Sequence, residues 1–480
     1  MPQKISVSLQ ENLAYLKNNF AVSDDFYTKP LQISGICCAV AMYTGVSSAE
    51  RLCRLALDML DRDPVVLQGG AGLCRYLLQQ SRIPTEPQPV TDWQSAAEFL
   101  SGGMTLLFIE GFGGAVVLST QDRPGRSVGT PQGEGNLRGA QDAFTEHLRS
   151  NLSLLRRQFR SGTLVAEIAT AHSRAKTEYC LCYDRALAPP DLVDALRKKL
   201  ADIEIPVLLD SAYFASFLKQ DKLNLFPAAA YTERPATVCA RLCEGKAAVL
   251  VAGSPYALVV PGFFAEHFEC LDDYSSGAVF AGLIRLLKYL AFLLAVFGPG
   301  LYVMAVAVTP EIIPLQLLAK LARGEQATPL PPMPEMLGVT LLLEIVREAG
   351  LRAPQSISHT VSLVGALILG ETAVSAGILS VPILTTAAAA TVATLAVPSL
   401  YEQTILFRFA VILLAGCFGV PGLAAAALTV LAMACGSEPF GYDSLYPLMP
   451  PGPAAWRDGF VRSIWSRLAK AGEVLGRDET

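Results

Sequence analysis

Histidine is scarce in this chain of 480 residues, and so are the motifs of common enzyme classes. The histidines are His147, His172, His267 and His359. They form no HExxH pair and lie in no recognisable nucleophile setting. The chain also lacks a G-x4-G-K-S/T phosphate loop and a G-x-G-x-x-G dinucleotide loop, so we interpret its glycine-rich runs at residues 67–72 and 111–114 as turns. We therefore expect no enzyme, no catalytic residues and no cofactor.

Clear metal ligands and basic surfaces are also missing. The best metal candidate pairs Cys239-x3-Cys243 with His267-x2-Cys270, but these spacings fit no common zinc finger or knuckle. Most of the 11 cysteines are more simply small apolar core residues, and no metal is expected. The net charge of −5, the pI near 5.6 and the lack of a Lys/Arg-rich strip with interleaved aromatics argue against nucleic acid as a partner.

The N-terminus lacks the apolar core of a signal peptide, so we expect the first part of the chain to stay in the reducing cytosol. Hydrophobic residues make up 52% of the chain and charged residues 17%, but the two are unevenly distributed. Charged residues are frequent up to about Tyr274, whereas Leu, Ala, Val and Ile dominate residues 277–435. Such a step marks a change of solvent from water to lipid.

Short strands alternate with amphipathic helices before this step. We predict helices at 11–20, 144–159 and 189–200, and strands at 104–110, 115–119, 178–183, 205–210 and 247–252. The pattern predicts an α/β or α+β cytosolic N-terminal domain with two subdomains, at residues 1–165 and 166–275. Arg156 and Arg157 are expected on a solvated helix face.

The apolar composition of the second part of the chain predicts an all-α polytopic membrane bundle over residues 276–436, followed by a basic cytosolic tail at 437–480. Its apolar stretches are 280–308, 361–379, 383–397 and 405–435. Glycines and Pro421 interrupt the last stretch, which is either one bent span or two short ones. With both chain ends in the cytosol the number of crossings is even, and we expect four. Arg285 and Lys288, near the start of the first stretch, are expected to snorkel to the cytosolic face.

Two segments between the apolar stretches are harder to place. The proline-rich residues 329–334 predict an extended hinge before the bundle, because proline cannot continue a helix. Residues 336–346 are short and charged, so a re-entrant, an interfacial and a buried position all stay open.

Ionisable residues inside the apolar part are the candidate functional groups, because an unpaired charge in lipid costs several kcal/mol. The candidate pore or gating residues are Glu335, Glu344, Glu371 and Arg408. Glu371 is the deepest by sequence and should face a bundle interior or an aqueous path, or else be protonated. A hydrogen bond between helices without a transport role is the alternative, and local pairing at an interface is a further one for Arg408 and Glu402.

Blocks of sequence along nearly the whole chain resemble the GerA spore-germination family. Those before the apolar part lie at 137–157, 226–235, 253–261 and 272–274. Those within it lie at 285–290, 299–302, 310–314, 331–335, 344–354, 364–377 and 408–409. The most similar members are the A-type subunits of bacterial germinant receptors, although an accessory homologue of the SpoVAF type is the alternative reading, which the sequence does not separate.

The resemblance implies a multi-pass protein of the spore inner membrane that works with a transporter-like B subunit and a lipoprotein C subunit. It implies an oligomeric, ion-conducting role, with nutrient binding generally placed in the B subunit; the accessory type would amplify ion or dipicolinic acid release without its own nutrient specificity. This chain departs from the family at Ala140, where proline is usual, and at Glu371, where glutamine is usual. The extra carboxylate could change the ion preference or make conduction depend on pH.

Overall fold

The structure is a computed structural model that divides into two compact units. It describes residues 4–48, 69–79, 87–121, 129–131, 133–136, 138–219, 224–325, 328–352, 370–449, 458–460, 462–468 and 475. The sheet unit comprises Met1–Gln220, Ala228–Gly262 and Ala471–Thr480, and the helical unit comprises Asp221–Pro227 and Phe263–Lys470. The chain therefore passes between the units at four points in the sequence.

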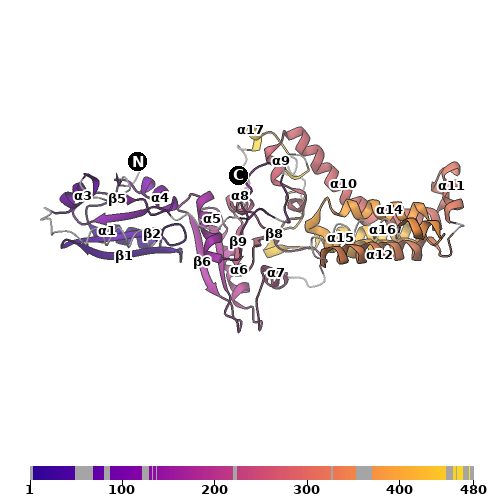
Figure 1. Cartoon of the computed structure of the whole chain (residues 1–480), viewed down its shortest axis with the longest axis horizontal. Helices are drawn as coiled ribbons and strands as arrows, with labels where there is room; N and C mark the ends of the chain where they lie inside the picture. The colour runs from indigo at the N-terminus through magenta and orange to yellow at the C-terminus, as the bar shows by residue number, and fades with distance from the viewer. Residues whose placement is uncertain are drawn as a thin grey trace. The chain divides into compact units, whose positions relative to one another are not determined.

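The first half of the sheet unit is a five-stranded antiparallel sheet in the order β1-β2-β4-β5-β3, drawn in indigo and purple in Figure 1. Its strands are β1 (Phe26–Ile33), β2 (Ile36–Tyr43), β3 (Gln88–Val90), β4 (Thr105–Ile109) and β5 (Ala115–Leu118). The accompanying helices are α1 (Leu9–Asn19), α3 (Gly69–Gln79) and α4 (Trp93–Ser101). Leu106 and Phe108 of β4 share a core with α1 and α4, whereas Leu107 and Ile109 share another with α3. Because alternate residues face opposite sides, this continuous apolar strand is buried on both faces.

The second half is another antiparallel sheet, in the order β6-β7-β9-β10-β8. Its strands are β6 (Leu164–Thr170), β7 (Glu178–Asp184), β8 (Ala230–Thr232), β9 (Ala247–Val251) and β10 (Ala257–Val260). The helices are α5 (Leu148–Gln158), α6 (Pro190–Ala201), α7 (Ser211–Leu218) and α8 (Pro235–Cys243). Leu155 of α5 and Leu242 of α8 pack against Cys182 and Leu250 in one core. Since all described strand pairs are antiparallel, the N-terminal part is α+β, the second of the two predicted classes.

The predicted strand at 205–210 is wrong, because these residues form irregular chain after α6. Only Glu204 forms an isolated bridge, to His172. Val207 and Leu209 are 45% and 62% exposed, so the apolar character of this segment does not come from burial in a sheet. The other predicted strands and helices overlap elements of the structure.

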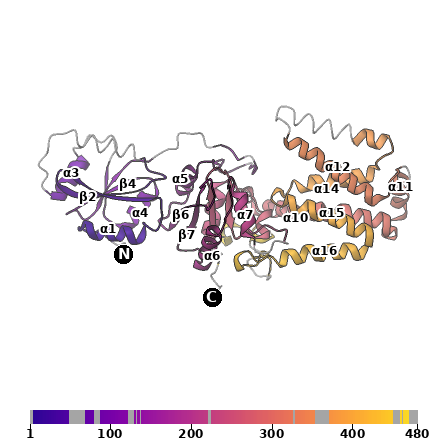
Figure 2. The same cartoon turned by 90° about the horizontal axis from the view of Figure 1, so that it is seen from below.

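The described α-helices of the helical unit range from 4 to 26 residues in length, and several of them are apolar. They are α9 (Leu271–Ser275), α10 (Ala278–Val303), α11 (Leu315–Glu325), α12 (Pro332–Arg352), α14 (Val381–Thr394), α15 (Tyr401–Phe418), α16 (Val420–Cys435) and α17 (Trp465–Leu468). Figure 2 shows α12, α14, α15 and α16 as a stack. A π-helical stretch, Met304–Val308, extends α10.

Close contacts show how α10 and α15 lie. A Cβ added at Gly300 of α10 would lie 2.6 Å from Val411 Cγ1 of α15, and one at Gly419 would lie 2.7 Å from Val308 Cγ1. Residue numbers rise together on both helices, so they run parallel and side by side. The small residue at position 300 lets the helices approach closely, as is common between membrane helices.

Two helices of the described residues are long and apolar enough to cross a membrane: Ala278–Val308 and the segment Pro398–Phe418, which contains α15. The helices Val381–Thr394 and Val420–Cys435 are apolar but shorter. The stretch predicted at 405–435 is two helices, divided at Gly419, where φ is +65°. Residues 361–369 of the stretch predicted at 361–379 lie outside the described residues, so four crossings and the four domain ranges stay predictions.

The proline-rich segment behaves differently from the prediction. Helix α12 begins at Pro332, so half of the expected hinge is helical. Proline is compatible with the first turn of a helix, where its missing N–H would have no helical partner. Residues 336–346, whose position the sequence left open, lie within this helix, and Met336 and Val339 are buried in a core with Val303.

Candidate functional site

Arg408 of α15 is 1% exposed and binds three helices of the unit. Its Nε donates to the backbone oxygen of Ala295 on α10 at 2.7 Å. Its Nη2 donates to the backbone oxygen of Ala390 on α14 at 3.0 Å and to Thr394 Oγ1. The Ala295 oxygen is free to accept because Pro299, four residues later in α10, has no N–H to donate to it. The Ala390 oxygen can accept through a second lone pair beyond its helical hydrogen bond.

The remaining side of Arg408 faces Glu344 of α12. Arg408 Nη1 lies 3.7 Å from Glu344 Oε1 and makes no hydrogen bond. Glu344 Oε2 accepts a hydrogen bond from the Tyr401 hydroxyl, and the Arg347 guanidinium lies 3.3 Å from the centroid of the Tyr401 ring. We call Arg408, Glu344, Tyr401 and Arg347 the Arg408 cluster. It holds two cations and one carboxylate, so its charge is not balanced within these four side chains.

Glu335 is 1% exposed and lies nine residues before Glu344 on α12. Its Oε1 accepts from the backbone nitrogen of Ser380, directly before α14, at 2.5 Å, and its Oε2 accepts from Thr328 Oγ1 at 3.3 Å. A carboxylate in the first turn of α12 is also favoured by the helix dipole. Through these contacts Glu335 links the first turn of α12 to the start of α14, which is a structural role.

Glu371 and Glu402 are exposed on the helical unit. No hydrogen bond or ion pair joins either of them to a residue that the structure describes. Glu371 therefore does not face the interior of its own bundle. Of the four candidate residues, the structure brings Arg408 and Glu344 together and places Glu335 and Glu371 apart from them.

The prediction that Arg285 snorkels to an aqueous face is wrong, because its side chain is fully buried. Arg285 Nη2 lies 3.2 Å from Asp273 Oδ2, and its Nη1 lies 3.0 Å from Asp458 Oδ1 and 3.7 Å from Glu269 Oε1. Three carboxylates thus replace water around this guanidinium. Lys288 donates to the backbone oxygen of Phe268 at 3.2 Å.

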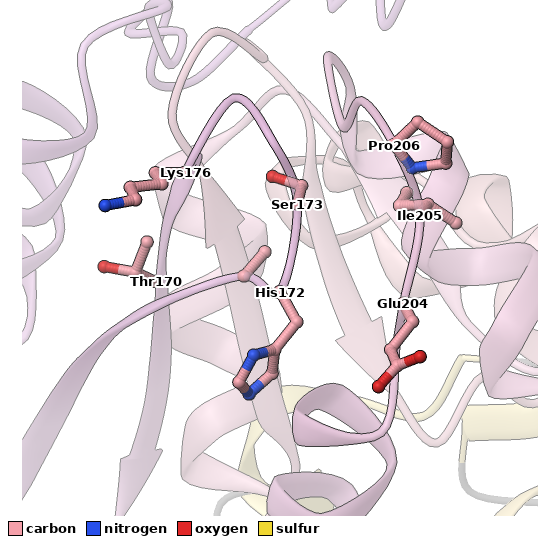
Figure 3. Close-up of a pocket in the computed structure, with 8 residues that line it drawn as sticks. Thr170, His172, Ser173, Lys176, Glu204, Ile205 and Pro206 are labelled. Atoms are coloured by element: carbon pink, nitrogen blue, oxygen red, sulfur yellow. The ribbon is translucent and has the colours of Figure 1, made fainter.

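The sheet unit has an open hollow of about 810 Å³ (Figure 3). It is lined by Thr170, Ala171, His172, Ser173, Lys176, Glu204, Ile205 and Pro206. In Figure 3 the His172 and Glu204 side chains project to the same side, and Lys176 lies on the other limb of the turn. The sequence did not predict this hollow, because it forms where the β6–β7 turn meets the segment after α6, which is distant in the sequence. Its ionisable side chains are one imidazole, one ammonium and one carboxylate.

The part of the 226–235 block that lies in the sheet unit contacts the 137–157 block through one buried arginine, Arg234. Arg234 is 3% exposed; its Nη1 donates to the backbone oxygen of Ala140 at 2.7 Å, and its Nε donates to that of Glu134 at 3.1 Å. Thr232 Oγ1 donates to the Glu134 carboxylate at 2.9 Å, and burial raises the pKa of this carboxyl.

Arg156 corrects another expectation, since it is 1% exposed rather than solvated. Its Nε and Nη2 donate to the two Asp25 oxygens at 2.5 and 2.6 Å, and its Nη2 also donates to Ser23 Oγ at 2.7 Å. The guanidinium lies 3.8 Å from the centroid of the Tyr43 ring. It therefore joins α5, in the second half of the unit, to the first half, whereas neighbouring Arg157 is 47% exposed.

Cys239 is the first cysteine of the candidate zinc site noted in the sequence. Burial raises the pKa of the Cys239 thiol to about 12, which disfavours the thiolate that binds metals. Within the part of the chain that the structure describes, no three His, Cys, Asp or Glu side chains lie together as metal ligands would.

The chain thus combines a sheet unit, made of two antiparallel α+β halves, with an apolar helical unit. The helical unit contains candidate membrane helices and the buried Arg408. The chain belongs to the Bacillus/Clostridium GerA spore germination protein family, which it matches over residues 14–473. Spore germination protein KA of Bacillus subtilis (strain 168) is 29% identical, over 100% of this chain and 88% of that protein.

Two further comparisons add relatives of different kinds. Stage V sporulation protein AF of Bacillus subtilis (strain 168) is 25% identical, over 82% of this chain and 79% of that protein. The solved N-terminal domain of the A subunit of the Bacillus megaterium spore germinant receptor GerK3 is 22% identical, with a TM-score of 0.43, over 55% of this chain and 98% of that domain.

Proposed function

We propose that this protein is an A-type subunit of a spore germinant receptor, a membrane complex that couples nutrient sensing to ion release at the start of germination. The observation that carries the proposal is membership of the GerA family over residues 14–473, which include both the sheet unit and the helical unit. The spore inner membrane would hold the helical unit, and the sheet unit would face the cytosol. B-type transporter-like and C-type lipoprotein subunits would be the partners.

The proposed ion-conducting role is supported by where the charges lie. The Arg408 cluster is a buried ionic contact between α12 and α15, and such groups in membrane helices often mark ion paths or gates. Glu371 is exposed on the single chain, so a pore that it lines would have to lie between chains. This favours a homo-oligomer in which each chain contributes one carboxylate to a shared path.

Potassium efflux from dormant spores tests the proposal. Spores with and without the gene are challenged with a panel of amino acids and sugars, and released potassium is followed with time. Loss of efflux toward one nutrient class alone is expected for a receptor subunit and would name the class of its ligand. Unchanged efflux toward every nutrient in spores that lack all other A-type genes would overturn the proposal.

The second candidate is an accessory protein that amplifies ion or dipicolinic acid release without its own nutrient specificity. The similarity to stage V sporulation protein AF favours it. In the same experiment this role would slow efflux by a similar factor for every nutrient. The two roles are therefore separated by whether the defect is selective.

A further inference from the structure

An apolar face of the sheet unit is left uncovered at α7 and the segment before it. Buried Ser211, Phe214 and Leu218 form one side of α7. The opposite side is exposed, and it presents Tyr213 and Phe217, at 45% and 46% exposure. Val207 and Leu209, just before the helix, are also exposed, so four large apolar side chains reach solvent within eleven residues.

This face has almost no charge. Asp210 is the one Asp, Glu, Lys, Arg or His residue between Ile205 and Leu218 in the sequence. Its carboxylate accepts hydrogen bonds from Ser254 Oγ at 2.5 Å and Ser211 Oγ at 3.1 Å, which turns it toward the body of the unit. A helix on the surface of a soluble protein normally places charged or polar residues outward, so an uncharged aromatic face indicates contact with another apolar phase.

The chain itself limits how far α7 can lie from the apolar helices. Asn224 belongs to the helical unit, and its Nδ2 donates to the backbone oxygen of Met433, near the end of α16, at 2.7 Å. Gln403, near the start of α15, donates to the backbone oxygen of Leu225 at 3.1 Å. Asn224 follows Leu218 by six positions in the sequence, so the chain between their Cα atoms spans at most about 22 Å.

The end of the bundle that binds Asn224 is where α15 begins and α16 ends. These helices have 18 and 16 residues, which correspond to lengths of about 27 and 24 Å, close to the hydrocarbon thickness of a bilayer. If they span the membrane, Met433 and Gln403 lie near its surface, and α7 is tethered within reach of the lipid headgroups.

We propose that the exposed face of α7, with Val207 and Leu209, binds the surface of the bilayer as an interfacial anchor of the sheet unit. This inference rests on the proposed membrane placement of the helical unit. Tyrosine and other amphipathic aromatics favour the headgroup region, where the ring is partly dehydrated and the hydroxyl stays hydrated. Because the face carries no net charge, the anchor binds through apolar contact and works on zwitterionic phosphatidylcholine.

Brominated lipids, which quench tryptophan on contact, test the anchor in the full-length chain. The variant Tyr213→Trp is reconstituted in phosphatidylcholine vesicles with or without brominated acyl chains, and the quenching of the parent chain is subtracted. The matched control is Tyr27→Trp, a tyrosine on β1 that is 39% exposed and far from the unit boundaries in the sequence. A second control, Leu301→Trp, places the probe on the exposed side of α10, at a residue that is 50% exposed.

We expect strong quenching of Leu301→Trp and little quenching of Tyr27→Trp. Quenching of Tyr213→Trp is expected to be at least twofold stronger than that of Tyr27→Trp. Quenching of Leu301→Trp with equal signals from Tyr213→Trp and Tyr27→Trp would overturn the anchor and leave the membrane placement standing. No quenching of Leu301→Trp would overturn the placement itself. Protection of Tyr213→Trp from both brominated lipid and aqueous acrylamide would assign the face to a protein partner and also overturn the anchor.

Discussion

At the scale of single residues, the chain depends on buried arginines in both units. Arg156, Arg234, Arg285 and Arg408 are each at most 3% exposed. Each binds carboxylates or backbone oxygens from segments far away in the sequence, so each fixes a tertiary contact. Where the partner is a buried carboxylate, as for Arg156 and Arg285, removing the arginine costs about 3–5 kcal/mol, because the carboxylate stays buried without compensation.

Arg156→Met tests this at the contact between the halves of the sheet unit. We expect it to lower the free energy of unfolding by about 3–5 kcal/mol, since Asp25 would stay buried without its cation. Arg157→Met is the matched control: its pair with Asp142 is exposed and 3.6 Å long, so a loss below about 1 kcal/mol is expected. Urea unfolding of the purified chain, followed by the fluorescence of the core residue Trp93, measures both. Equal losses would show that the buried pair does not stabilise the unit.

At the scale of elements, the closest helix contact is the one between α10 and α15. Gly300→Ala would place a Cβ 2.6 Å from Val411 Cγ1 and 3.0 Å from Val411 O, so the helices must separate. Overpacking of this kind costs about 1–3 kcal/mol. Gly338→Ala on α12 has no atom within 4 Å of the added Cβ and should leave stability unchanged or slightly raised. Thermal unfolding in detergent compares them, and similar midpoints would contradict the tight packing.

The same scale shows what the sequence could predict. The long helix at 278–308 was predictable because its apolar run continues for several turns. Strands β4 and β5, joined by a tight turn, were predictable because both are predominantly apolar. The irregular structure of residues 205–210 was not predictable, because apolar composition does not distinguish a buried strand from an exposed surface segment. The Arg408 cluster was half predictable: sequence picks out Arg408 and Glu344 as ionisable groups, but Ala295, its backbone acceptor, carries no side-chain signal.

At the scale of the whole molecule, Glu371 is an exposed carboxylate of the helical unit. If chains assemble around an ion path, a ring of carboxylates would attract cations while ionised and lose that charge as the pH falls. We expect Glu371→Gln to reduce the pH dependence of conductance in planar bilayers, and to conduct less than the parent chain at neutral pH. Glu402→Gln, another exposed carboxylate of the helical unit, is the control. The same pH profile for the parent and for Glu371→Gln would sink the idea.

The four points at which the chain passes between the units also bear on how the protein is made. The second sheet of the sheet unit is complete only after Val260, because β8, β9 and β10 follow the segment Asp221–Pro227, which belongs to the helical unit. On the ribosome, Leu225 and Phe226 therefore emerge before their partners, and Phe226 must wait for Phe407, about 180 residues later in synthesis. During that interval the side chains of Leu225 and Phe226 lack the helical-unit residues against which they pack in the folded chain. We therefore expect the nascent chain to need protection of these apolar residues until α15 has been synthesised.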